Sequence, residues 1–355
     1  MQIYRAALVG CGRMGAFIDN EVVGRTTSPL PYSHAAGYEA CSRTDLVAGS
    51  DMRVDVLGKF GARYGVTPEH HYTDFKELIL REQPDILSIA TQPHQRAEVA
   101  LFAMEHGVKA LYVEKPLCAS ISEANALREA AERHSVVVNM GTNRRWDPGF
   151  AAMRAAIVSG DFGQLSTLIT FHRATLFNTV SHWVDTLFVL NGDAPVSWVQ
   201  AYMADGDEAI VGDQVIADPY TEGTIAFANG VEAHLIATPG APMHHAFCEN
   251  AELVAVGGTA GFEVRRAGEA TTTLDYTPAS STVRLIEDLV HALDTGEPTR
   301  GGIDVARANT EVLFAMLESH RQGGQRIPLP LAESPLTFVP ANLAPRQPKY
   351  APSPA

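Results

Sequence analysis

The sequence has little cysteine, few basic residues and no long apolar run, and each shortage excludes a class of protein. Its 355 residues contain only four cysteines and no CxxC pair, which is too sparse for a disulfide framework. Lysine and arginine number 27 against 41 aspartates and glutamates, so a net charge of −14 repels phosphate backbones and anionic lipid. No window approaches the length of a membrane span, and the N-terminus lacks signal-peptide features. We therefore expect no nucleic-acid partner, no membrane and a cytoplasmic protein.

The sequence does contain two successive patterns of apolar residues. From Tyr4 to His134, short apolar runs alternate with segments whose apolar residues recur at helical spacing. Strands that alternate with helices predict a parallel sheet covered on both faces. The expected strands are 5–10, 45–50, 85–90, 109–114 and 135–140, and "SISE" (120–123) has the pattern of a capping box at the start of a helix.

After about Pro148 the pattern changes to consecutive strands, and the Asn-Gly pair in "FANGVE" is a hairpin signal. Consecutive hairpin-linked strands predict an antiparallel sheet, and residues 238–246 are expected to form a loop. Two further helices are expected at about 281–295 and 303–321, and the last stretch is rich in proline. A chain of 355 residues is longer than one core usually organises, so we expect two domains.

A glycine-rich loop follows the first predicted strand. "VGCGRMGA" places Gly10, Gly12 and Gly15 in a GxGxxG pattern between that strand and a helical segment. In this context the first glycine allows a tight turn, the second lets the backbone approach a pyrophosphate, and the third permits close helix–strand packing. The pattern alone is weak evidence, but here it has the strand–turn–helix setting that dinucleotide binding requires.

An acidic residue, Asp51, follows the second strand. A carboxylate there accepts hydrogen bonds from the adenine-ribose hydroxyls and repels a 2′-phosphate, which favours NAD over NADP. Arg53, two residues later, leaves NADP open as an alternative. Asp51 lies 36 residues after Gly15, where about 20 is usual, and the excess is the segment 19–33, which we interpret as an inserted loop near the cofactor.

Five stretches resemble, in order, the motifs of the Gfo/Idh/MocA family, the relatives of glucose–fructose oxidoreductase and inositol dehydrogenase. They are "VGCGRMG", "IATQPHQRAEV", "VEKPL", "NRRWDP" and "HWVDTLFVLNGD", and the similarity extends over roughly residues 3 to 325. The resemblance implies NAD(P)-dependent oxidation or reduction of sugars and cyclitols, and a homodimer or homotetramer joined through an open sheet. The expected fold is α/β: a Rossmann doubly wound parallel sheet over 1–143, an α+β domain with a large open, mostly antiparallel sheet over 144–330, and a proline-rich tail over 331–355.

The most specific motif is "ALYVEKPL", residues 109–116, in which a buried strand ends on Glu114, Lys115 and Pro116. In an open parallel sheet, ligands bind beyond the carboxyl ends of the strands, so we expect Glu114 and Lys115 at the nicotinamide. In relatives the Lys-Pro bond is commonly cis. Lys115 is expected to orient the reacting hydroxyl and relay its proton.

The second element is "SHWVD", in which His182 and Asp185 share one face of a helix. In the family the matching histidine is the usual proton acceptor or substrate ligand, and a neutral imidazole suits the removal of a hydroxyl proton. Many members have an aspartate four residues before this histidine, where this chain has Asn178. Asparagine cannot accept a proton, so the base is His182 or Lys115, and Asn178 and Asp185 are expected to orient the substrate.

The remaining site residues are expected in the loops that follow the predicted strands. An arginine in the loop after the strand 135–140 would suit either the binding of an acidic sugar or a bracing contact at the domain junction. Besides the residues above, the expected cofactor ligands are Cys11, Arg13, Met14, Met52, Thr91, Gln92, Pro93, His94, Asn143 and Arg145, and the expected substrate ligands are Arg144 and Trp146.

No metal site is expected. The histidine pairs in "EHH" (69–71) and "MHHAFC" (243–248) lack a third ligand in a recognised spacing.

The expected function is an oxidoreductase that uses NAD, with NADP as the alternative, on a secondary hydroxyl of a sugar, cyclitol or glycoside. Two rivals stay open. A redox-neutral glycosidase would oxidise its substrate transiently and release no NADH, and a regulator would bind dinucleotide without catalysis. The presence of Lys115 and His182 argues against the regulator, because a sensor has no need of a proton relay.

Overall fold

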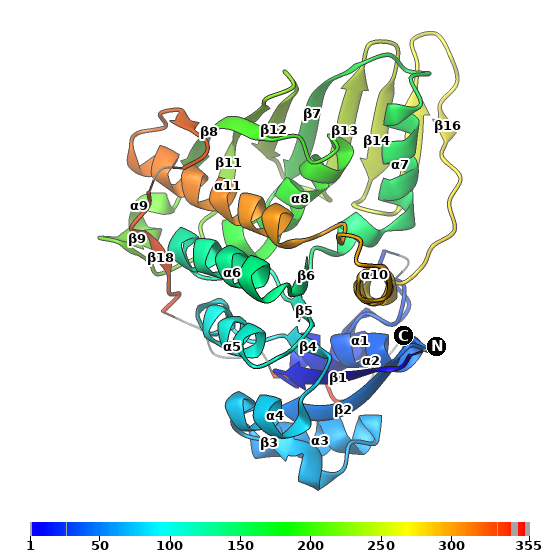
Figure 1. The fold of residues 1–355 in the computed structure, drawn as a ribbon. Helices are drawn as coiled ribbons and strands as arrows, with labels where there is room; N and C mark the ends of the chain where they lie inside the picture. Colours follow the sequence, from blue (N-terminus) through cyan, green and yellow to red (C-terminus); the bar gives the residue numbers. More distant parts are fainter. Residues whose placement is uncertain (1, 26, 332, 342–346, 352–355) are drawn as a thin grey trace. The chain divides into compact units, whose positions relative to one another are not determined.

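The computed structural model describes residues 2–25, 27–331, 333–341 and 347–351 (Figure 1). The chain divides into two compact units. Unit 1 comprises 1–143, 279–307 and 343–355, and unit 2 comprises 144–278 and 308–342. The first division, between Asn143 and Arg144, lies at the expected boundary, but the chain then returns to unit 1 instead of forming one continuous second domain. Much of the proline-rich tail, 332, 342–346 and 352–355, lies outside the described residues.

Unit 1 is built on a parallel sheet that is six-stranded among the described residues, in the order β3-β2-β1-β4-β5-β6. The order reverses direction between β1 and β4, which is the doubly wound arrangement expected from the alternating sequence. The strands are β1 (Tyr4–Val9), β2 (Thr44–Ser50), β3 (His71–Tyr72), β4 (Ile86–Ile89), β5 (Ala110–Val113) and β6 (Val137–Met140).

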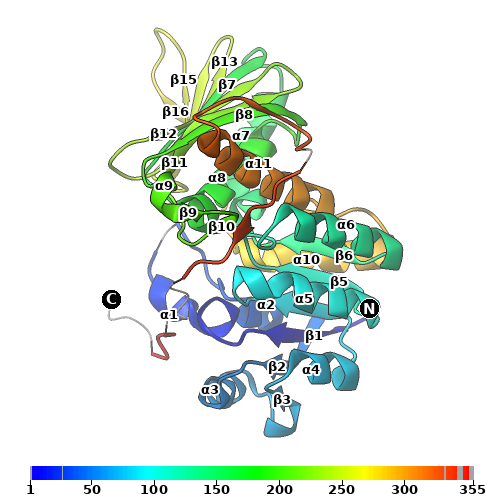
Figure 2. The same ribbon diagram turned by 90° about the vertical axis from the view of Figure 1, so that its left-hand side faces the viewer.

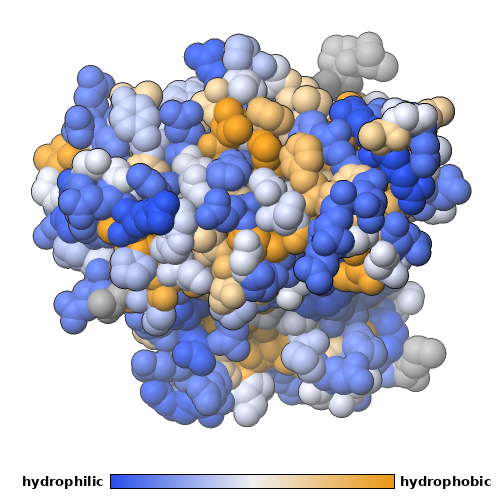
Figure 3. Space-filling view, turned by 90° about the horizontal axis from the view of Figure 1, so that it is seen from above, coloured by the Kyte–Doolittle hydropathy of each residue, from blue (hydrophilic) through white to orange (hydrophobic). Residues whose placement is uncertain are grey.

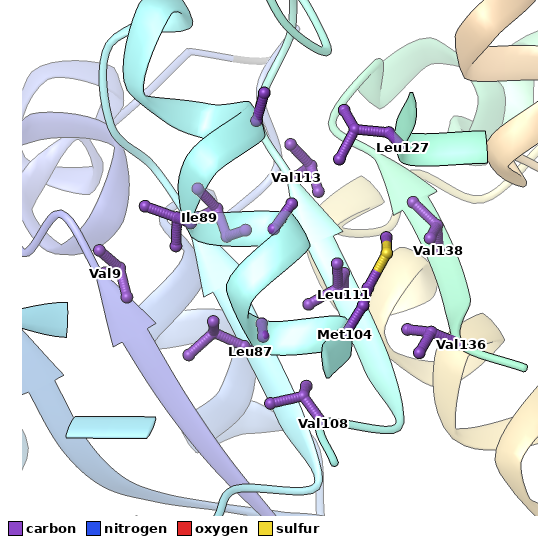
Figure 4. Close-up of a cluster of buried hydrophobic side chains, with 14 of the residues drawn as sticks. Val9, Leu87, Ile89, Met104, Val108, Leu111, Val113, Leu127, Val136 and Val138 are labelled. Atoms are coloured by element: carbon purple, nitrogen blue, oxygen red, sulfur yellow. The ribbon is translucent and has the colours of Figure 1, made fainter. Parts of the chain in front are cut away.

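Helices cover both faces of this sheet. On one face, α4, α5 and α6 pack over an aliphatic cluster that includes Val9, Leu87, Leu111 and Met104 (Figures 2 and 4). On the other face lie α2, α3 and α10. The helices are α2 (His34–Ala40), α3 (Val54–Tyr64), α4 (Phe75–Glu82), α5 (Pro93–Glu105), α6 (Ile121–His134) and α10 (Ser281–Thr295), with a short turn η2 (Pro68–His70) before β3.

The segment 19–33 interrupts the helix that follows the glycine loop. In place of one continuous helix the chain forms the helical turn η1 (Arg13–Phe17), the single turn α1 (Asp19–Val22) and then, beyond the loop, α2. The Asp19 carboxylate ties the loop's end back to its start, because it accepts from the backbone N–H of Tyr32 at 2.8 Å and of Ser33 at 3.0 Å. Thr26 lies outside the described residues.

Unit 2 contains a mixed, mostly antiparallel sheet that has nine strands within the described ranges, ordered β16-β15-β14-β13-β7-β12-β11-β8-β17. Only the β12–β7 pair is parallel among the pairings of this sheet in the described residues. The strands are β7 (Leu165–His172), β8 (Val196–Met203), β11 (Thr221–Phe227), β12 (Glu232–Ala237), β13 (Met243–Cys248), β14 (Glu252–Val256), β15 (Gly261–Arg265), β16 (Thr272–Thr273) and β17 (Ile327–Pro328).

Helices α7 (Pro148–Val158) and α8 (Ser181–Leu190) pack against one face of this sheet, where Phe150 and Trp183 contact His244. The opposite face carries partly exposed apolar side chains, including Tyr202 and Ile236, which are 57% and 37% exposed. The smaller elements of unit 2 are η3 (Asn143–Trp146) at the boundary, η4 (Leu176–Val180), α9 (Gly206–Ala209), and a short sheet of β9 (Ile210–Val211), β10 (Gln214–Val215) and β18 (Thr337–Phe338).

The expected fold class is confirmed: a doubly wound parallel sheet followed by a mostly antiparallel one. The helices expected near 281–295 and 303–321 are α10 and α11 (Ile303–Arg321). The prediction that 238–246 is a loop was wrong in its second half, because Met243 begins β13. No helix among the described residues is both long enough and apolar enough to cross a bilayer.

Candidate active site

The glycine loop after β1 has the geometry of a turn that only glycine allows. Gly10 has a φ of +94°, and a Cβ there would lie 2.7 Å from the carbonyl oxygen of Ala90. A Cβ on Gly15 would lie 1.9 Å from the Gly10 carbonyl oxygen. Any side chain at either position would collide with backbone, so both glycines are required by the turn itself.

The loop also fits the approach of a dinucleotide. A Cβ on Gly12 would meet the Arg53 guanidinium at 2.8 Å and the Asp51 carboxylate at 3.9 Å, so this backbone faces the two side chains expected at the adenine ribose. After β4, the buried hydroxyl of Thr91 has no hydrogen-bond partner in the described part of the chain.

Asp51 and Arg53 form an ion pair at the end of β2. The Arg53 Nε lies 3.1 Å from Asp51 Oδ1, and the Arg53 backbone N–H donates to the same oxygen at 3.0 Å. The second carboxylate oxygen, Oδ2, is 3.3 Å from Arg53 Nη2. The two side chains therefore act as one unit, and the ribose and 2′-phosphate contacts expected of them stay predictions.

Glu114, Lys115 and Pro116 follow β5 at the carboxyl edge of the sheet, and the Lys115–Pro116 bond is cis. Arg96 on α5 holds this turn to the loop after β4: it donates to the Thr91 carbonyl from Nη2 at 2.7 Å and from Nη1 to the Pro116 carbonyl. Arg96 is 6% exposed, and burial lowers its pKa to about 10. One buried guanidinium thus fixes two loops that are expected to contact the cofactor.

Glu114 is buried in a hydrogen-bonded chain that leads into α2. Its Oε1 lies 3.1 Å from His34 Nε2, and His34 Nδ1 lies 3.0 Å from the Ser88 hydroxyl. The Ser88 hydroxyl also lies 2.8 Å from that of Tyr38. Burial acts to raise the pKa of Glu114, but the hydrogen bond and charge of His34, with Lys115 and Arg96, outweigh it and hold the pKa below its usual value. Glu114 is therefore a carboxylate, and His34 fixes its position.

In unit 2, His182 and Asn178 lie on consecutive helical elements after β7. His182 is half-buried on α8, whose start is held by Asn309, which donates to the Ser181 carbonyl at 2.9 Å. Asn178 is on η4, and its backbone N–H donates to the Asp218 carboxylate at 2.9 Å while its side-chain amide donates to Thr179. The local structure places an amide and an imidazole four residues apart in helical segments.

Asp185 lies against Arg145 in the interior of unit 2. Arg145 donates to Asp185 Oδ1 from Nη2 at 2.7 Å and also pairs with Asp193 at 2.8 Å. Asp185 is fully buried and Arg145 is 6% exposed. Although burial disfavours the guanidinium, the two carboxylates raise the pKa of Arg145, so the cluster stays ionised. This contact fixes the two side chains against each other, in addition to the ligand roles expected of them from the sequence.

The predicted site residues divide between the units at Asn143 and Arg144. The glycine loop, Asp51, Thr91 and Lys115 belong to unit 1. The predicted site residues from Arg144 onward belong to unit 2. Among the cofactor predictions, Met52 and His94 are exposed and Pro93 begins α5. Arg144 lies over the Trp183 ring at 4.2 Å from its centre, and Trp146 is fully buried. The roles of these residues stay predictions.

Sequence reasoning missed His34 and Arg96. His34 acts through contacts with residues distant in sequence, for which the sequence carried no signal, whereas Arg96 lies in the motif "IATQPHQRAEV" and was assigned no role there. No group of three or more potential metal ligands occurs among the described residues.

Residues 4–142 match a family model described as "Oxidoreductase family, NAD-binding Rossmann fold". A myo-inositol dehydrogenase of Streptomyces leeuwenhoekii is 31% identical over 164 residues, which is 46% of this chain and 43% of that protein. A D-apiose dehydrogenase of Paraburkholderia graminis is 26% identical over 160 residues, 45% of this chain and 38% of that protein. The matched stretches thus span about half, or less, of the length of these relatives.

Solved structures show the same fold over most of the chain. An inositol dehydrogenase homologue from Azotobacter vinelandii, complexed with NADH and myo-inositol, has a TM-score of 0.76 at 18% identity and covers 92% of this chain and 98% of its own. An oxidoreductase from Desulfitobacterium hafniense gives 0.77 at 18% identity, with the same coverage of both chains. The family match places residues 4–142 in the Gfo/Idh/MocA family of oxidoreductases, and the glycine loop and the Glu-Lys-Pro turn lie within this part of the chain.

Proposed function

We propose that this protein is an NAD-dependent oxidoreductase that acts on a secondary hydroxyl of a sugar, cyclitol or glycoside. The observation that carries the proposal is the position of Lys115 at the carboxyl end of β5. The glycine loop follows β1 at the same edge of one parallel sheet, which is where such sheets bind ligands. Relatives named as inositol and apiose dehydrogenases support a polyhydroxylated substrate.

Each residue has a task that its surroundings suit. Gly10, Gly12 and Gly15 would hold the pyrophosphate and Asp51 the adenine ribose. NAD, when bound, supplies the hydride acceptor. Lys115 would orient the reacting hydroxyl and relay its proton.

In unit 2, Asn178 can only orient a substrate hydroxyl, because an amide side chain does not accept a proton near neutral pH. His182 has an imidazole, which is able to accept a hydroxyl proton near neutral pH. The base is therefore proposed to be Lys115 or His182.

The direct test is to incubate the protein with NAD⁺ and a panel of sugars, cyclitols and aryl glycosides, following NADH absorbance and products together. NADH that appears with a keto product is the expected result. Cleavage of a glycoside without NADH would replace the proposal with a redox-neutral glycosidase. NAD binding with neither product across the panel would favour a non-catalytic regulator.

The Asp51–Arg53 pair predicts how the cofactor is chosen. Asp51→Ala is expected to weaken NAD⁺ binding by about 10- to 100-fold, because a charge-assisted hydrogen bond contributes about 1.5–3 kcal/mol. Arg53→Ala is expected to leave NAD⁺ binding nearly unchanged and to weaken NADP⁺ binding. Titration of each variant with both dinucleotides, followed by tryptophan fluorescence, checks this. Equal losses for both dinucleotides in Asp51→Ala would contradict the ribose contact.

We also propose a homodimer or homotetramer that covers the open sheet face. This face carries partly exposed apolar residues from neighbouring strands, among them Phe171 and Ile236, and an apolar sheet face of this kind is usually covered. Figure 3 shows apolar side chains among hydrophilic ones on one face of the protein.

A further inference from the structure

The last described segment of the chain, 347–351, packs on unit 1 beside the glycine loop. It belongs to unit 1, and its Tyr350 packs against an apolar cluster that includes Cys11 of the loop and Phe17 of the helical turn after it. Tyr350 is half-buried, and the residues on either side of it are exposed. The reaction proposed above assigns no role to this segment.

The Tyr350 ring joins the two helical elements that follow the expected cofactor-binding loops. Its centre lies 4.9 Å from that of Phe17, edge to face at 78°, and Phe17 ends η1, which begins directly after Gly12. On the other side, Lys59 Nζ lies 3.7 Å from the centre of the Tyr350 ring, and Lys59 is on α3, which begins directly after Arg53. Both kinds of contact are attractive, so one side chain holds α3 to η1.

Hydrogen bonds fix the backbone of the segment to α1 and α3. The Asn20 side-chain amide donates to the Lys349 carbonyl at 2.6 Å, and Arg63 donates from Nη1 to Asn20 Oδ1 at 3.1 Å. Asn20 lies on α1 and is 4% exposed, and Arg63 lies on α3. The segment is therefore held by three elements that are far from it in sequence.

The spacing between η1 and α3 determines the shape of the expected dinucleotide site. A Cβ on Gly12 would lie 2.8 Å from the Arg53 guanidinium, so the two elements begin almost in contact. The hydrogen bond to Asp51 raises the pKa of Arg53, and Tyr350 is close enough to add to this effect. Binding sites depend on positions held to about 0.5 Å, so a shift of α3 away from η1 would weaken dinucleotide binding.

The contact is also one that can open while unit 1 stays folded. A cavity of about 530 Å³ borders the Tyr350 ring, and it is lined by Phe17, Asn20, Lys59, Ala62, Arg63 and Tyr350. The ring is therefore not enclosed as a core side chain is. Segments with few buried contacts open locally at much lower free energy than the whole domain unfolds.

We propose that Tyr350 is a positioning residue for the dinucleotide, because the docked segment 347–351 holds α3 against η1 in the arrangement that binds the cofactor. This rests on the proposed roles of the glycine loop and Asp51, and it adds a residue from a distant part of the chain. Coupling between two sites is reciprocal, so a bound dinucleotide also stabilises the docked segment. Tyr350 acts through Phe17 and Lys59 and has no part in the proton transfer.

The first test measures NAD⁺ binding by calorimetry in the wild type, Tyr350→Ala and Tyr350→Phe. Tyr350→Ala removes the ring contacts with Phe17 and Lys59, and the dissociation constant of NAD⁺ is expected to rise about 5- to 50-fold, within the usual range for coupling between two sites. Tyr350→Phe keeps the ring and is expected to bind NAD⁺ nearly as tightly as the wild type.

Phe75→Ala is the matched control. Phe75 is likewise half-buried in unit 1, packs edge to face on Phe102 with ring centres 5.9 Å apart, and has Lys76 Nζ at 5.4 Å from its ring centre. It lies on α4, which carries none of the predicted cofactor ligands, so NAD⁺ binding is expected to stay unchanged. Thermal unfolding verifies that both alanine variants are folded at the temperature of the titration.

The second test measures the reciprocal effect on the segment itself. Trypsin cleaves after Lys349 when the segment is detached, and the rate follows the population of the open form. Saturating NAD⁺ is expected to slow this cleavage in the wild type by about 5- to 50-fold, the same factor as above. Cleavage after Arg266, which is exposed directly after β15 in unit 2, is expected to stay unchanged. Mass spectrometry of the products measures both rates.

Unchanged NAD⁺ binding in folded Tyr350→Ala, or cleavage after Lys349 that NAD⁺ does not slow, would overturn the proposal. Tighter binding in Tyr350→Ala would also overturn it and would show that the segment competes with the dinucleotide. Equal losses in Tyr350→Phe and Tyr350→Ala would overturn the role of the ring contacts. A wild type that binds neither NAD⁺ nor NADP⁺ would reject the proposed function itself, whereas failure of the Tyr350 role alone leaves wild-type binding intact.

Discussion

Lys115→Ala is expected to lower kcat about 10³-fold, since positioned proton transfer typically contributes 10²- to 10⁴-fold. The reason is the position of the lysine at the carboxyl edge of β5, beside the Glu114 carboxylate and on the cis bond to Pro116. The dissociation constant for NAD⁺ is expected to change little, because the glycine loop and Asp51 remain. Steady-state kinetics on the best substrate of the panel, with NAD⁺ titration by fluorescence, measures both quantities.

Lys109→Ala is the control for this experiment. Lys109 lies just before the other end of β5, is 57% exposed and pairs with Asp85 on the surface. Its removal is expected to leave kcat unchanged. A Lys115→Ala enzyme with near-normal kcat would contradict the proposed role and transfer the base to His182.

His34→Leu is expected to destabilise unit 1 by about 3–5 kcal/mol, the usual effect of removing one partner from a buried pair that includes a charge. The substitution would leave the Glu114 carboxylate, which is 4% exposed, and the Ser88 hydroxyl without the imidazole that joins them. Urea unfolding followed by circular dichroism at pH 7 provides the free energy of unfolding.

A second histidine–glutamate pair supplies the control. His291 lies 3.0 Å from Glu297, but both side chains are more than half exposed. Exposed pairs contribute about 0–1 kcal/mol, so His291→Leu is expected to be nearly neutral. Equal effects of the two substitutions would show that burial of Glu114 is energetically unimportant.

The lowered pKa of Glu114 sets the pH dependence of this contribution. A carboxyl whose folded-state pKa lies below its unfolded value of about 4.3 adds stability above that pH and loses it as the pH falls through the folded-state pKa. In Glu114→Gln this contribution is absent at every pH. The difference in unfolding free energy between wild type and Glu114→Gln is therefore expected to be largest near neutral pH and to shrink below about pH 4. A difference independent of pH would contradict an ionised Glu114.

Local patterns were sufficient for most of unit 1. The buried strands, the helix after the Ser120 cap and the glycine turn follow from hydrophobic periodicity, a capping side chain and the steric freedom of glycine. The structure confirms the cap, since Ser120 accepts from the Glu123 backbone N–H at 3.1 Å. These features depend on residues close together in the chain, and so they can be predicted from the sequence.

The second unit was predicted less completely because its elements are defined by long-range pairing. Strand β13 was missed because "MHHAFC" has no strong apolar alternation, and its conformation depends on pairing with β7, more than 70 residues earlier. The return of the chain to unit 1 through α10 likewise depends on long-range contacts. One of them is the hydrogen bond that the Thr282 hydroxyl donates to the Tyr32 carbonyl at 3.0 Å.

The sequence by itself determined the fold class, the dinucleotide loop and the identity of Glu114, Lys115 and His182 as candidates, because turns and motifs are local. Only the tertiary structure decided which side chains support them. His34 reaches Glu114 across 80 residues, and Arg96 joins two loops. Burial, which makes these contacts strong and shifts the pKa values, is a property of packed surroundings and of no residue alone.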